Sequence, residues 1–187
     1  MSLTLYLRVL SDRFKPHEVE SMVQAVADEV RWIDERTLKA DLDEFKKVQL
    51  KLMFPSIQHD LGISLCGIVG FDSDLLMSHF LDVAAEHKTG KLSGAHETLI
   101  LSCRLNNFDL IRRLDRIFER VDRDAMETAR MYLDTGRNVN ASAKHLYLHR
   151  NTFRYRLNKF IRQTSLDIRE NEQGKLMETW YILSNIE

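Results

Sequence analysis

Basic and polar side chains that could contact nucleic acid are concentrated in one short stretch of this sequence. Between Gly136 and Ser165 there are seven Lys or Arg residues and no Asp or Glu. Asn, Thr, His and Tyr side chains are interleaved with these cations. Cations neutralise phosphates, and polar side chains hydrogen-bond to base edges. The composition of the stretch therefore predicts contact with double-stranded DNA.

The spacing of the apolar residues predicts the elements that position these side chains. Phe153, Leu157, Phe160 and Ile161 recur at i, i+4, i+7 and i+8, which is one stripe of an α-helix. A shorter helix with Ala143 precedes it, and we expect Asn140 to be its N-cap. Two such helices joined by a tight turn predict a helix-turn-helix. The alternative, a basic helix face that is merely solvated, stays open on charge alone.

The motif HRNTFRYRL, preceded by the NVNASAKHLYL segment, resembles the C-terminal helix-turn-helix of the PucR/CdaR family of bacterial transcription regulators. It is more distantly similar to the Fis-type helix-turn-helix. The resemblance covers about Asp124 to Ile186. Tyr147 departs from the Fis pattern, in which Gly is common near the turn. A left-handed backbone at a residue other than Gly costs about 1 kcal/mol or more.

We expect the amino-terminal end of the helix at about 150–162 to enter the major groove. The candidate DNA-binding residues are Asn140, His149, Arg150, Asn151, Thr152, Arg154, Tyr155, Arg156 and Lys159. We expect contacts with base edges from Asn151, Thr152 and Tyr155. The Arg and Lys residues would mainly contact phosphates, and Asn140 would help to fix the register of the protein on the DNA. The Fis-type comparison supports His149, Arg150, Thr152 and Arg154. One small domain contacts few base pairs, so we expect a homodimer with half-sites roughly 34 Å apart.

Composition and charge limit the remaining functions. The net charge of the whole chain is −1, but the charge is unevenly distributed. Residues from Gly136 onward include nine basic and five acidic side chains, whereas the preceding residues include eighteen basic and twenty-three acidic ones. An acidic regulatory or assembly domain attached to a basic DNA-binding domain is expected from this asymmetry. The sequence has no run of 18 apolar residues and no basic region before its apolar N-terminus, which predicts a cytoplasmic protein without membrane contact. Cys66 and Cys103 are predicted to be buried free thiols, with a disulfide as the alternative.

The fold class predicted is α+β and helix-rich: a small α/β domain over 1–123, followed by an all-α helix-turn-helix domain over 124–187. We expect strands at 3–9, 63–71 and 97–105, with a polar loop at 88–94. Helices are expected at 19–33, at 37–53 until Pro55, after Asp72 or Ser73 up to Gly90, at 108–121, at 124–135 and at 172–186. Trp180 is assigned to the core of the C-terminal domain, with an exposed dimer contact as the alternative.

Residues 56–115 weakly resemble a degenerate GGDEF-like domain, but the cyclase signature Gly-Gly-Asp/Glu-Glu-Phe is missing from the sequence. We therefore expect no enzyme, and we assign no catalytic residue, no cofactor and no metal ligand. The PucR/CdaR resemblance implies that the N-terminal part senses a signal such as a small-molecule effector, whose identity the sequence does not give. Two alternatives stay open: a nucleotide cyclase with a DNA-binding tail, and a helix-turn-helix that binds proteins without binding DNA.

Overall fold

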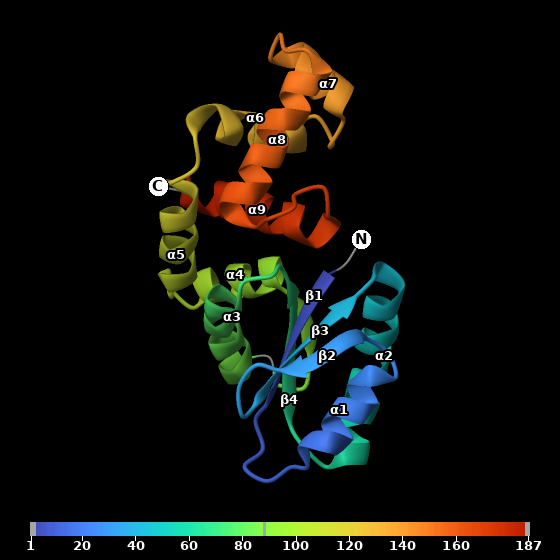
Figure 1. Cartoon of the computed structure of the whole chain (residues 1–187). Coiled ribbons are helices and arrows are strands. Elements are labelled where there is room, and N and C mark those ends of the chain that lie inside the picture. Colours follow the sequence, from blue (N-terminus) through green and yellow to red (C-terminus); the bar gives the residue numbers. More distant parts are fainter. Residues whose placement is uncertain (1–2, 88, 186–187) are drawn as a thin grey trace. The chain divides into compact units, whose positions relative to one another are not determined.

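The computed structural model describes residues 3–87 and 89–185 and divides the chain into two compact units, one ending at Leu101 and the other beginning at Ser102 (Figure 1). The first unit holds a five-stranded sheet with helices, and the second contains only helices among its described residues. The predicted α+β, helix-rich class is confirmed. In the described part of the chain, no helix is both long enough and apolar enough to cross a membrane.

The sheet of the first unit has the strand order β2-β3-β1-β4-β5. Its strands are β1 (Leu3–Val9), β2 (Asp28–Trp32), β3 (Thr37–Leu42), β4 (Leu65–Gly70) and β5 (Leu92–Gly94). The central strand β1 pairs antiparallel with β3 and β4, whereas β4 and β5 are parallel. The predicted strands at 3–9 and 63–71 are thus confirmed, and the second is buried along its whole length.

Helices cover both faces of this sheet (Figure 1). On one face, α1 (Pro16–Gln24) and α2 (Glu44–Leu61) bury Val19, Leu50 and Phe54 against the strands. On the other face, α3 (Asp74–His87) packs on β1 and β4. The helix α4 (Ala95–Arg104) follows β5 and contains the division between the two units.

Two helices predicted in the first unit are wrong over part of their length. The expected helix at 19–33 ends at Gln24 and gives way to β2, whose start has a register shift beside Glu29 (φ +47°). The expected helix at 37–53 begins as strand β3, where Leu38, Ala40 and Leu42 alternate into the core. Its helical part starts only after the N-cap Asp43 and runs through Pro55 to Leu61.

Burial explains why Pro55 does not end α2. Leu50, Phe54 and Ile57 form a buried stripe that continues past it, and Pro55 itself faces solvent. Burial of large apolar side chains of this kind contributes about 1.5–3 kcal/mol each, which offsets the roughly 3 kcal/mol cost of an interior proline.

The expected strand at 97–105 is also wrong, because Ala95, Thr98, Leu99 and Ser102 are buried at i, i+3, i+4 and i+7, which is helical spacing. Part of the expected polar loop at 88–94 is instead the strand β5; Lys88 lies outside the described residues. Cys66 is buried and Cys103 half-buried, and both are free thiols. Burial raises the pKa of Cys66 to about 11.

The second unit is built from α5 (Asp109–Phe118), α6 (Arg123–Asp134), α7 (Val139–His145), α8 (Arg150–Thr164) and α9 (Asn171–Ser184). The sequence predicts a domain boundary after residue 123, but α5 packs with the helices that follow it. The Phe118 ring lies 4.1 Å from Trp180 and 6.2 Å from Phe160, centroid to centroid. Trp180 is buried and donates its Nε1 hydrogen to Asp115 at 2.7 Å, so its assignment to the core is confirmed.

Candidate nucleic-acid interface

The first helix of the motif, α7, is fixed by a cap and by a buried hydroxyl pair. Its N-cap is Asn138 rather than the predicted Asn140: the Asn138 side-chain oxygen accepts the backbone N–H groups of Asn140 and Ala141 at 3.0 and 3.1 Å. The fully buried Ser142 hydroxyl donates to the Asn138 carbonyl and lies 2.6 Å from the Thr135 hydroxyl of the preceding segment. These contacts set the angle between α6 and α7, and they leave the Asn140 side chain exposed.

The turn between α7 and α8 is a Schellman motif. The Leu148 N–H donates to the Ala143 carbonyl at 2.8 Å, and the Tyr147 N–H donates to the Lys144 carbonyl at 3.2 Å. Tyr147 occupies the left-handed position with φ +53°, and its side chain is 97% exposed. Gly is the usual residue there. The strain expected from the sequence is therefore present in the structure.

The second helix, α8, begins at Arg150 with His149 as its N-cap, whose Nδ1 accepts the Asn151 N–H at 3.3 Å. Its apolar stripe is buried as predicted at Phe153, Leu157 and Phe160, and half-buried at Ile161. Figure 1 shows α7 and α8 side by side at one end of the helical unit. The packing turns the opposite face of α8 outward.

The seven basic residues of the motif divide into two groups by their partners. Three form ion pairs with carboxylates on other segments: Arg137 with Glu178 at 3.5 Å, Arg156 with Asp124 at 3.3 Å and Lys159 with Asp122 at 2.8 Å. The other four are exposed and form no ion pair within the described residues: Lys144, Arg150, Arg154 and Arg162.

The Lys159–Asp122 pair belongs to a small surface network at the start of α6. The Lys159 hydrogen bond lowers the pKa of Asp122, and the Gln163 amide, which donates to the same oxygen at 2.6 Å, lowers it further. Reciprocally, the Asp122 hydrogen bond raises the pKa of Lys159. This network holds the second half of α8 against the α5–α6 connection.

Most of the predicted site residues are exposed in the structure. Seven of the nine are exposed and close in sequence around the turn and the first turns of α8: Asn140, His149, Arg150, Asn151, Thr152, Arg154 and Tyr155. Arg156 and Lys159 are half-buried and paired, as described above. Lys144 and Tyr147 are exposed beside these residues and are missing from the predicted set. The sequence signal that could have identified Tyr147 is a large aromatic residue at a turn position where Gly is common.

No group of three or more His, Cys, Asp or Glu side chains within the described residues is placed to hold a metal ion. In the described part of this surface, the chemistry available is that of amides, hydroxyls, imidazole and unpaired cations. Such a surface can bind phosphate and base edges without a cofactor.

Known proteins resemble this chain in sequence over a short segment and in fold over its whole length. An uncharacterized protein, YxkF of Bacillus subtilis, is 36% identical over 59 residues, which are 32% of this chain and only 20% of that protein. The crystal structure of a regulator of polyketide synthase expression from Bifidobacterium adolescentis aligns with 100% of this chain and 82% of that one, at a TM-score of 0.50 and 17% identity. At this identity the second likeness concerns the fold alone.

The family comparison locates the motif more closely. The model of the PucR C-terminal helix-turn-helix domain matches residues 125–175, a range that includes α7, the Tyr147 turn and α8. The match agrees with the resemblance carried by HRNTFRYRL and with the caps and packing of the two helices. Residues 125–175 of this chain are a PucR C-terminal helix-turn-helix domain.

Proposed function

We propose that this protein is a non-enzymatic transcription regulator that binds double-stranded DNA through α7 and α8. The observation that carries the proposal is the set of four exposed cations without ion-pair partners in the described residues: Lys144, Arg150, Arg154 and Arg162. Cations that have no carboxylate in the protein can neutralise phosphates without first breaking an ion pair. The PucR-type domain and the fold shared with a regulator support this role.

In the proposed complex, the amino-terminal end of α8 lies in the major groove. Asn151, Thr152 and Tyr155 face base edges, and Arg150 and Arg154 hold the phosphates on either side. His149 caps the helix and reaches the same groove, while Asn140 and Lys144 on α7 fix the register. Arg156 and Lys159 contribute to phosphate binding only by leaving Asp124 and Asp122. We place Tyr147 beside the sugar–phosphate backbone.

A single α8 covers few base pairs, so we propose a homodimer on two half-sites about one helical turn, roughly 34 Å, apart. We propose that the part of the chain before the helix-turn-helix, residues 1–123, receives the regulatory signal from a small-molecule effector. We propose that the protein works in the cytoplasm, where its DNA would be.

The test is a mobility shift of the full chain with a duplex from upstream of its own gene, beside an unrelated duplex. Binding should be selective and should weaken steeply with salt, because each phosphate contact adds about 0.9 to the slope of log K against log salt. Chemical cross-linking or analytical ultracentrifugation of the complex should detect a protein dimer on the duplex. A monomer bound to its preferred duplex would contradict the proposed dimer but not the proposed DNA binding.

One observation favours a second function, the binding of a protein. Tyr147 and Tyr155 are 97% and 62% exposed, and exposed aromatic side chains are common at protein interfaces. An apolar protein contact depends little on salt, so the salt series separates the two functions. Retardation of neither duplex at low salt would favour the protein-binding module.

A further inference from the structure

One side of α2, in the sheet unit, is apolar and exposed to solvent. Phe45, Val48 and Leu52 recur at i, i+3 and i+7, so they lie on one stripe of the helix. Their exposed fractions are 78%, 55% and 77%. Exposed hydrophobic residues that are scattered singly need no explanation, whereas a contiguous apolar patch indicates a site of interaction. Within the described residues, no other helix or strand exposes as many large hydrophobic side chains as α2.

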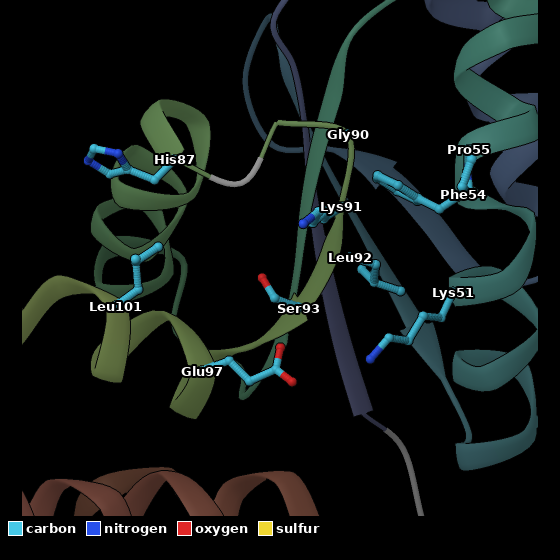
Figure 2. Close-up of a pocket in the computed structure, with 10 residues that line it drawn as sticks. All are labelled: Lys51, Phe54, Pro55, His87, Gly90, Lys91, Leu92, Ser93, Glu97 and Leu101. Atoms are coloured by element: carbon cyan, nitrogen blue, oxygen red, sulfur yellow. The ribbon is translucent and has the colours of Figure 1, made fainter. Parts of the chain in front are cut away.

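The fold of the sheet unit does not use this stripe, because the opposite side of α2 packs on the sheet. Leu50, Phe54 and Ile57 are buried on that side and belong to the hydrophobic core. Figure 2 shows the Phe54 ring pointing from α2 toward Leu92 of β5. A helix that is apolar on two opposite sides is normally covered on both. In the described part of the chain, only one side of α2 is covered.

The charges beside the stripe favour a second copy of this chain as the partner. Glu44 and Lys51 are seven positions apart, which places them on the same flank of the stripe, and both are exposed. Glu44 pairs with Lys47 at 2.8 Å through one of its two carboxylate oxygens. Lys51 forms no ion pair within the described residues. The flank therefore presents a carboxylate at one end and an ammonium group at the other.

A twofold axis close to Val48 would bring these features together. If two α2 helices pack antiparallel there, Val48 meets Val48 of the second copy, and Phe45 meets Leu52. In an antiparallel pair each flank faces the same flank of the other helix. Glu44 of each copy would then face Lys51 of the other, so two charge-assisted contacts would form beside the apolar stripe.

A parallel pair of the same helices would lack these ion pairs. In that orientation each flank faces the opposite flank of the other helix, five positions further along. Glu44 would then face Gln49, and Lys51 would face Ser56, neither of which carries a charge. The charge pattern thus distinguishes the two orientations and favours the antiparallel one.

We propose that α2 is a homodimerisation surface, on which the stripe of Phe45, Val48 and Leu52 packs antiparallel against the same stripe of a second copy. The stripe covers on the order of a few hundred Å² per copy, which is less than the roughly 800 Å² per partner of a standard interface. We therefore expect a weak and reversible dimer. Its role on DNA rests on the proposed function, whereas self-association of the chain does not.

The first test is sedimentation equilibrium of the full chain without DNA, over low to high micromolar concentrations. The wild type should become dimeric as its concentration rises. Leu52→Glu should weaken the dimer at least tenfold, because it places a carboxylate against Phe45 of the second copy. The matched control is Leu75→Glu, since Leu75 on α3 is 79% exposed and lies outside the stripe; this variant should dimerise like the wild type.

Both leucines are exposed, so neither variant should lower the melting temperature of the monomer. A wild type that stays monomeric at every concentration would overturn the proposal. A dimer that Leu52→Glu leaves intact would overturn it as well, because the copies would then meet through another surface.

Cysteine cross-linking under mild oxidation tests the antiparallel arrangement. Val48→Cys should give a disulfide-linked dimer, because the two copies of this position meet at the axis. Leu52→Cys should not, since its two copies would lie roughly 12 Å apart along the helices and a disulfide needs Cα atoms within about 7 Å. The wild type, with its thiols Cys66 and Cys103, is the control. Equal cross-linking of both variants would indicate parallel helices and overturn the proposal.

A mobility shift on the same samples tests DNA binding separately. A wild type that dimerises through α2 but retards no duplex would contradict the proposed function and support the dimer surface. A wild type that retards its duplex but sediments as a monomer without DNA would overturn the dimer surface and leave DNA binding in place.

Discussion

The first part of α8, residues 150–155, and the rest, residues 156–164, contain the same kinds of residue but are used differently; they are called the first and second half below. In the first half, Arg150 and Arg154 are exposed and have no ion-pair partner within the described residues. In the second half, Arg156 and Lys159 are half-buried and pair with Asp124 and Asp122, while Arg162 near the end of the helix is exposed and has no ion-pair partner within the described residues. The difference is set by two carboxylates beside Arg156 and Lys159: Asp122 in the α5–α6 connection and Asp124 in the first turn of α6. Within one basic helix, the paired residues support the fold and the unpaired ones are available to DNA.

The largest effect tests the apolar stripe that both halves share. Phe153 is fully buried between the exposed residues of the first half. Phe153→Ala should lower the free energy of unfolding by about 3–5 kcal/mol, measured by urea denaturation, and DNA binding should be lost with the fold. A variant that stays stable but no longer binds DNA would show that Phe153 acts in the interface, against the division described here.

The next effect compares one arginine from each half. Arg154→Ala should weaken binding to all duplexes and reduce the salt slope by about 0.9, with stability changed by no more than about 0.5 kcal/mol. Arg156→Ala should affect stability more and DNA binding less: up to about 1 kcal/mol of unfolding free energy should be lost, with a smaller change in the salt slope. Thr152→Ala, in contrast, should change which sequence is preferred. Equal salt slopes for the two arginine variants would remove the distinction between the halves.

Replacing Tyr147 by glycine should change stability and DNA affinity in opposite directions. Tyr147→Gly removes a left-handed non-glycine residue, so the protein should become more stable by roughly 1 kcal/mol. The same change removes a fully exposed ring beside the proposed DNA surface, so affinity should fall. Tyr147→Phe keeps the ring and the strain, and it therefore isolates the hydroxyl. A glycine variant with higher stability and unchanged affinity would show that Tyr147 has no part in binding.

The sequence predicted the helix-turn-helix better than the sheet unit, for a physical reason. In α8 the signal is local, because Phe153, Leu157 and Phe160 repeat at helical spacing and face a nearby core. In β3 it is not: Leu38, Ala40 and Leu42 become a strand because β1 and β2 lie on either side. Where apolar residues fit both the helical and the strand spacing, contacts with residues distant in the sequence determine which secondary structure forms.

The candidate site shows the same limit. The sequence identified which residues of α8 face away from the apolar stripe, since this follows from 100° per residue. It missed that Arg156 and Lys159 would pair, because Asp124 and Asp122 lie in another segment. The sequence also predicted the wrong N-cap for α7, Asn140 instead of Asn138. The two residues have the same side chain, so only the position at which the helix starts distinguishes them. Counting charges within one stretch cannot find neutralising partners outside it.

The smallest effect concerns the pH dependence of the paired half. Lys159 and Gln163 lower the pKa of Asp122 in the folded protein, so the folded state binds its proton less readily than the unfolded chain does. The stability from this network is therefore complete above the unfolded carboxyl value of about 3.9 and is lost as pH falls through the lower folded value. Urea denaturation of the wild type and Asp122→Asn should differ by a constant amount above about pH 5 and converge in acid. DNA affinity near neutral pH should stay close to wild type in this variant. If the affinity rose instead, the released Lys159 would be binding phosphate, and the second half of α8 would belong to the DNA interface as well.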